Sequence, residues 1–178
     1  GGTAMIPFKE NRSQYLHGIP MFNAAFGNIK IRTVSAHPHG SHVLLISDNA
    51  LLYSYGNNEY GQLGIGTRGS FIMSPTIVTP LVENGGKAIA CAAGADHSLV
   101  VVETEDRRLV KSRSFDGKPE NGELMVHHQM YGFGRNDSQK LGLTSKKAQP
   151  ETVLLPRRVD LRCSVRNFGS GIVMVRAG

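Results

Sequence analysis

The sequence predicts an all-β protein, and three observations support this fold class. Short runs rich in apolar, β-branched and aromatic residues, such as 51–55 and 98–102, are separated by glycine, asparagine and proline at close intervals. No segment repeats its apolar residues with the 3.6-residue period of a long helix. The chain also repeats itself along its length. Short strands with such turns fit a sandwich, a barrel or a propeller.

The internal repeat has one constant offset. A glycine-rich, aromatic stretch at residues 51–66 recurs at residues 130–143 without a gap. Such self-similarity is typical of proteins that stack copies of one structural unit. The matching pairs are Tyr53 and Tyr131, Gly56 and Gly134, Asn58 and Asn136, Leu63 and Leu141, and Gly64 and Gly142.

We interpret one repeat as one four-stranded antiparallel sheet. Its aromatic strand at residues 51–55 leads into a tight turn at residues 56–58, because glycine and asparagine adopt positive φ at little cost. The alanines of residues 88–93 predict a strand that packs very closely against a neighbour. The apolar run at residues 98–102 is typical of a strand that is buried on both faces.

The order of these residues carries a family resemblance. The residues that we expect to be structural in the first clear copy are Tyr53, Gly56, Asn58, Gly61, Gln62, Leu63, Gly64, Gly66, Gly94 and His97. In the next copy they are Gly134, Asn136, Leu141 and Gly142. This pattern resembles the repeat of the regulator of chromosome condensation family. The resemblance implies β-propeller blades of four antiparallel strands, with about three units of an expected seven-bladed propeller.

The repeats divide the chain into five segments. His42 takes the place of His97 in a degenerate first unit, and Ile172 takes it in the last unit. Three units cannot close a ring. We therefore expect a partial propeller or a fragment, which needs further blades from elsewhere. The segments are an N-terminal segment at 1–19, a degenerate first repeat at 20–50, a complete repeat at 51–102, a polar insertion loop at 103–129, and a third repeat at 130–178, degenerate at its end.

Two motifs imitate ligand sites. Residues 64–69 read GxGxxG, but that motif binds dinucleotides only between a strand and a helix, and no helical pattern follows it here. His37, His39 and His42 read HxHxxH, a spacing that could present imidazoles to a metal ion. No cysteine or carboxylate accompanies these histidines, and the repeat already accounts for His42. We therefore expect no cofactor and no metal.

Asp96, His97 and Ser98 suggest a base beside a nucleophile. Adjacent residues on a strand point to opposite faces, so His97 and Ser98 are not expected to reach each other. The carboxylates of the chain lie in apparent loops and not along one strand face. We predict no catalytic residues, and hence a protein that is not an enzyme.

The insertion at residues 103–129 is the most distinctive feature of the chain. The net charge is +6, yet the basic residues occur mostly singly or in short pairs. This scatter favours a solvated surface over a nucleic-acid site, although chromatin binding stays open. Surface insertions often carry function. The basic residues that we single out as a candidate partner-binding set are Arg107, Arg108, Lys111 and Arg113.

The family resemblance implies a platform for protein–protein interaction. The family includes a guanine-nucleotide exchange factor for the small GTPase Ran, so a Ran-like GTPase is one candidate partner. The alternatives are a scaffold region of a larger multidomain protein, such as a ubiquitin ligase, or a chromatin-binding module. No apolar run is long enough to cross a membrane, and neither cysteine has a CxxC spacing. These features predict a location in the cytoplasm, the nucleus or both.

Overall fold

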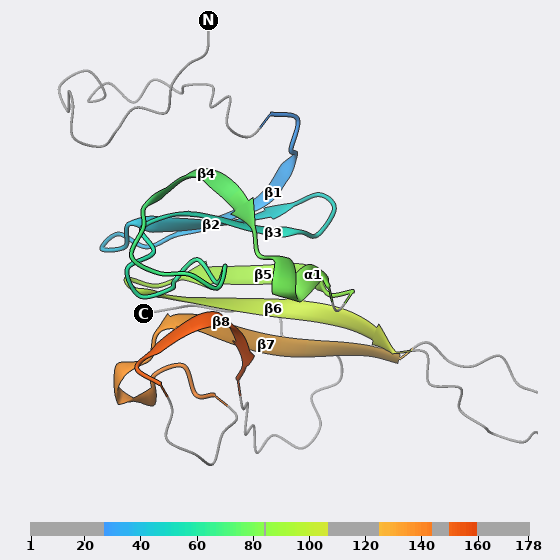
Figure 1. Ribbon diagram of the computed structural model, residues 1–178. Helices are drawn as coiled ribbons and strands as arrows, with labels where there is room; N and C mark the ends of the chain where they lie inside the picture. The colour runs from blue at the N-terminus through green and yellow to red at the C-terminus, as the bar shows by residue number, and fades with distance from the viewer. Residues whose placement is uncertain (1–26, 84, 107–124, 144–149, 160–178) are drawn as a thin grey trace, which may run out of the picture.

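The computed structural model describes residues 27–83, 85–106, 125–143 and 150–159. These residues form two four-stranded antiparallel sheets that lie one above the other (Figure 1). Sheet 1 has the order β1-β2-β3-β4, with bounds Ile31–Ala36, His42–Ser47, Leu52–Gly56 and Ile72–Ile77. Sheet 2 has the order β5-β6-β7-β8, with bounds Lys87–Ala93, His97–Asp106, Met125–Arg135 and Thr152–Arg158.

The helices of the described part are short. The single-turn helix α1 (Thr79–Val82) carries the chain from β4 to β5, and a 3-10 turn, η3 (Asp137–Gln139), follows β7. No helix among the described residues is long and apolar enough to cross a membrane. The all-β prediction is confirmed, and two such sheets fit a partial propeller.

The strand register agrees with the alignment of the degenerate first unit. His42 pairs with Gly56 at the start of β2, and His97 pairs with Gly134 at the start of β6. Both glycines have a strongly positive φ, +110° and +100°. The two sheets are therefore built on the same plan, in which a histidine at the start of the second strand pairs with a glycine near the end of the third strand.

The interpretation of one repeat as one sheet is wrong. The complete repeat at 51–102 supplies β3 and β4 to sheet 1 but β5 and β6 to sheet 2. The reason lies in how the chain turns. A tight turn joins β2 to β3, with the Ala50 N–H donating to the Ser47 carbonyl at 2.9 Å, so these strands pair across the repeat boundary. After β4 the chain leaves the sheet through α1, whose Leu81 is buried between the sheets.

The insertion begins and ends as strand. The β6–β7 ladder continues past Glu103 opposite His128 as far as Asp106 opposite Met125. The predicted loop at 103–129 is therefore wrong at both of its ends, because cross-strand pairing extends the hairpin. In Figure 1 these two strands reach farther than their neighbours. The four basic residues singled out in the insertion lie outside the described residues.

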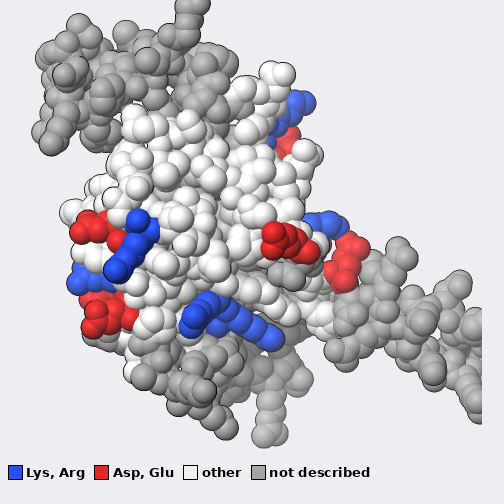
Figure 2. All heavy atoms as spheres, in the orientation of Figure 1, with Lys and Arg blue, Asp and Glu red and all other residues white. Residues whose placement is uncertain are grey.

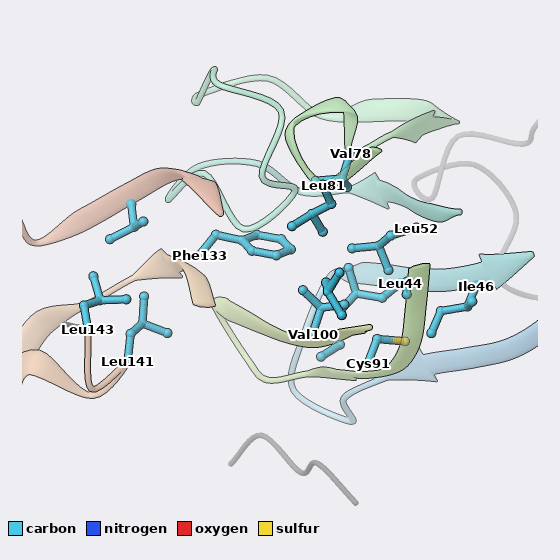
Figure 3. Packing of buried hydrophobic residues seen from close by; sticks show 14 residues of the cluster. Leu44, Ile46, Leu52, Val78, Leu81, Cys91, Val100, Phe133, Leu141 and Leu143 are labelled. Atoms are coloured by element: carbon cyan, nitrogen blue, oxygen red, sulfur yellow. The ribbon is translucent and has the colours of Figure 1, made fainter. Parts of the chain in front are cut away.

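One apolar core joins the two sheets. Its members come from both sheets, from α1 and from the segment after η3, and Figure 3 shows Phe133 among side chains of both sheets. The alanine-rich strand β5 packs against β1 and β2, as its small residues predict. The buried members are Leu44, Ile46, Leu52, Val78, Leu81, Ala88, Cys91, Ala93, Val100, Val102, Phe133, Leu141, Leu143 and Val153.

Gln139 occupies a place that suits glycine. It stands at the repeat offset from Gly61, and the two have similar left-handed backbones, with φ of +56° and +75°. Left-handed φ costs an L-residue with a side chain about 1 kcal/mol or more. We therefore expect Gln139→Gly to raise the free energy of unfolding by about 0.5–1 kcal/mol in urea titrations, after the greater chain entropy of glycine is allowed for.

Glu59 is the matched control for Gln139. It is exposed in the equivalent turn of sheet 1 and has an ordinary negative φ. Glu59→Gly is expected to destabilise by about 0.5–1 kcal/mol. Equal effects of the two substitutions would contradict the role of the left-handed backbone.

Candidate functional site

The seam between the two sheets holds a chain of buried polar groups. His42 lies at the start of β2 in sheet 1, and Ser98 lies in β6 of sheet 2. The His42 Nε2 and Ser98 Oγ are 2.9 Å apart, and the Ser98 hydroxyl donates to the Gln62 carbonyl at 2.7 Å. All three residues are buried. Ser98 is thus hydrogen-bonded both to the start of β2 and to the turn after β3.

Burial controls the protonation of the seam histidines. The pKa of His42 is lowered to about 4, chiefly by burial and then by the neighbouring His97, while Asp96 opposes the shift. The pKa of His97 is also lowered, chiefly by burial and then by Lys140. Both imidazoles are therefore neutral at pH 7.

His97 and Ser98 point to opposite faces of β6, as predicted. Ser98 faces sheet 1, whereas the His97 imidazole lies over Gly94, where a side chain would collide with the ring. Asp96 forms an ion pair with Arg135 at 3.3 Å. Because the Ser98 hydroxyl is fully buried and already donates to a carbonyl, these three residues do not form a nucleophile, base and orienting acid.

The asparagine turns have the same geometry in both sheets. The Asn58 Oδ1 accepts from the Leu63 N–H at 3.2 Å, and its Nδ2 donates to the Thr67 carbonyl at 2.9 Å. The Asn136 Oδ1 accepts from the Leu141 N–H at 3.0 Å, and its Nδ2 donates to the Pro150 carbonyl at 3.0 Å. A buried asparagine thus closes each turn with a hydrogen bond to the backbone five residues on.

The glycines of the GxGxxG stretch make contacts between sheets. A Cβ at Gly64 would lie 2.8 Å from the Phe133 ring, and one at Gly61, just before this stretch, would lie 2.7 Å from Leu154. The Gly66 N–H donates to the Leu154 carbonyl of sheet 2 at 2.9 Å. The N–H groups of Gly64 and Gly69 also donate to carbonyls, at 3.0 and 2.9 Å. These amides are not available to hold a phosphate.

The HxHxxH histidines do not converge. The His39 N–H donates to His37 Nδ1 at 3.2 Å, and their ring centroids are 5.7 Å apart. The His42 ring is turned into the seam toward Ser98. Within the described ranges, no three side chains of histidine, cysteine, aspartate or glutamate are placed to hold a metal ion.

Other residues of the predicted structural set lie in strands and turns of sheet 1 and in the turn after β7. Tyr53 pairs with Leu45 and is buried, and the Leu63 carbonyl accepts from the Ser54 hydroxyl at 2.7 Å. The Gln62 Oε1 accepts from the Tyr60 N–H at 2.8 Å. The Gly142 N–H donates to the Gln139 carbonyl at 3.0 Å, as Gly64 donates to Gly61 in the matching turn.

Sequence reasoning missed several residues of the seam. The Ser35 Oγ accepts from the Ala93 N–H at 2.9 Å, and an Arg32 guanidinium N–H donates to the Ala88 carbonyl at 3.0 Å. Both contacts cross from β1 to β5. Phe133 was missed too, although it stands at the repeat offset from Tyr55, which was a signal in the sequence.

Charge is dispersed over the described surface. Figure 2 shows basic and acidic side chains in small separate groups on the face in view. Lys87 pairs with Glu105, and Arg135 and Lys140 both pair with Asp137. The described residues contain slightly more carboxylates than lysines and arginines. The net positive charge of the chain therefore comes from residues outside them.

Comparisons of the sequence with known proteins place these features in a family. Residues 49–101 match the family model described as the regulator of chromosome condensation (RCC1) repeat. A Protein RCC2 homolog of Danio rerio is 28% identical over 122 residues, which cover 68% of this chain and 21% of that protein. The X-linked retinitis pigmentosa GTPase regulator of Mus musculus is 36% identical over 63 residues, or 35% of this chain and 6% of that protein.

Solved structures agree with the fold. Human WBSCR16 matches with a TM-score of 0.50 and 25% identity over 76% of this chain and 26% of that chain. Prp20p of Saccharomyces cerevisiae matches with a TM-score of 0.50 and 18% identity over 78% of this chain and 27% of that chain, a likeness of fold alone. The Prp20p structure is described with binding to Gsp1p and histones. The chain thus spans 21% of the RCC2 homolog, 6% of the retinitis pigmentosa GTPase regulator, and 26% and 27% of the two solved chains.

Proposed function

Because the chain belongs to the regulator of chromosome condensation repeat family, we propose that its blades bind a protein partner and that this partner is a small GTPase of the Ran type. The observation that carries the proposal is the hairpin stem, defined as residues 103–106 of β6 and 125–128 of β7. It continues beyond the other strands of sheet 2 and presents Val126 with half of its surface exposed. A projecting, partly apolar element of this kind suits recognition of another protein.

The geometry of sheet 2 explains why the stem projects. The pairing of β5 with β6 begins at Lys87 opposite Glu103, and the pairing of β7 with β8 ends at Tyr131 opposite Arg158. Beyond these points the described part of the sheet is only two strands wide.

Nucleotide exchange would need no reactive side chain. An exchange factor works by binding the GTPase better in its nucleotide-free state, so a seam in which the Ser98 hydroxyl is already hydrogen-bonded is compatible with it. The names of relatives support the choice of partner: one is called a GTPase regulator, and the Prp20p structure is described with Gsp1p. We place the protein in the cytoplasm, the nucleus or both on the same grounds.

Release of a fluorescent guanine nucleotide from a Ran-like GTPase tests this function. We expect the protein to accelerate release at least about tenfold over buffer, the factor that about 1.4 kcal/mol of differential binding supplies. Val126→Asp should remove the acceleration, because a buried charge at a contact is costly. The matched control is Val34→Asp on β1, which is also exposed, at 64%. Release at the buffer rate, or equal loss in both variants, would contradict the proposal.

A further inference from the structure

The seam between the sheets has a fixed set of protons. The Ser98 hydroxyl has one proton, which it donates to the Gln62 carbonyl at 2.7 Å. Its oxygen must therefore accept at 2.9 Å from His42 Nε2, so the neutral His42 ring carries its proton on Nε2. The other ring nitrogen, Nδ1, is buried and has no hydrogen-bond partner among the described residues. A second proton on His42 would have to sit on this unpartnered atom.

The surroundings of His42 are poorly suited to the positive charge that the ring would gain on protonation. A positive charge on His42 is opposed by His37 in the loop between β1 and β2 and by His97 at the start of β6. Asp96 is the carboxylate that attracts a charge on His42, but it already pairs with Arg135 at 3.3 Å. A cation at His42 would thus gain little from its neighbours and would lose the solvation of bulk water.

Because His42 lies at the contact between the two sheets, the cost of protonating it falls on that contact. His42 is 2% exposed, its Nε2 contacts Ser98 of β6, and Ser98 in turn donates to the turn after β3. Movement of sheet 2 away from this end of sheet 1 would remove Ser98 from the His42 ring and expose the ring to water. We propose that the seam is an acid-sensitive joint, in which protonation of His42 releases sheet 1 from sheet 2.

The direction of the pH dependence follows from linkage. Burial holds the pKa of His42 at about 4 in the closed seam, whereas an exposed histidine has the ordinary value of 6.5. Above pH 6.5 neither form binds the proton and the closed seam keeps its full stability. As the pH falls from 6.5 toward 4, only the open form is protonated, so the ratio of open to closed rises by up to about tenfold per pH unit. Below pH 4 the ratio changes no further through this group.

His42→Gln tests the joint, because glutamine keeps an N–H donor for Ser98 but does not titrate. We expect amide exchange at β2 and β6 in the unmodified protein to accelerate by up to about tenfold per pH unit below 6.5, after correction for intrinsic rates. In His42→Gln we expect a weaker dependence on pH in that range, because only His97 of the two seam histidines still titrates. His127→Gln, at an exposed histidine, is the control and should keep the pH dependence. Equal pH dependence in His42→Gln and the unmodified protein would overturn the proposal.

A direct titration protects the test against a variant that fails to fold. The ring proton shifts of His42 in the unmodified protein should report protonation with a midpoint near 4, together with loss of contacts across the seam. A midpoint at or above 6 with the seam intact would overturn the proposal. Because neither measurement uses a GTPase, the result does not depend on the proposed function.

Discussion

Phe133→Ala is expected to lower the free energy of unfolding by about 3–5 kcal/mol. The Phe133 ring is fully buried in the core that joins the sheets, and it lies directly beneath Gly64 of the turn after β3. Truncation removes the largest fully buried side chain and leaves a cavity at the seam. Because Gly64 belongs to a turn held by its own hydrogen bonds, the structure cannot easily collapse into the space.

Urea titration of Phe133→Ala beside Phe71→Ala measures this effect. Phe71 is 51% exposed, so its truncation should cost less than about 1 kcal/mol. The comparison separates the loss of core packing from the loss of a phenyl ring in general. Similar costs at the two positions would show that the described seam does not hold the sheets together.

Gly134→Ala is expected to destabilise by about 3–5 kcal/mol or to prevent folding. A Cβ at this position would lie 2.6 Å from the Asp96 carbonyl oxygen and 2.7 Å from the His97 Cα, both of which are backbone atoms that cannot rotate away. The backbone φ of +100° adds strain for any residue with a side chain. Strain and overpacking contribute about 1–3 kcal/mol each.

Gly69→Ala is the control for this glycine. Gly69 has a similar φ of +89°, but a Cβ there meets open space. Its substitution should therefore show the backbone strain alone, about 1–3 kcal/mol. Urea midpoints and circular dichroism of both variants provide the measurement. An equal loss in the two variants would mean that the close approach of β6 to Gly134 has no energetic importance.

The contacts across the seam could not be predicted from the sequence pattern. The repeat pattern identifies Gly64 as a structural residue. The reason that glycine is needed there is the Phe133 ring packed against it, a contact between residues far apart in the chain. Ser98 was weighed as a nucleophile beside His97, and the structure turns it instead toward His42 of the other sheet. Neither partner could be read from neighbours along the chain, because a strand pattern tells which residues share a face but not what lies opposite that face.

The sequence by itself determined the all-β class, the asparagine turns and the alignment of His42 with His97. These features depend on local conformation, since turns that need left-handed φ select glycine or asparagine and leave a visible mark. Only the tertiary structure decided that one repeat is shared between two sheets and that the ends of the insertion extend the β6–β7 hairpin. Strand pairing and seam contacts join distant residues, so their energy depends on the whole arrangement and not on any segment alone.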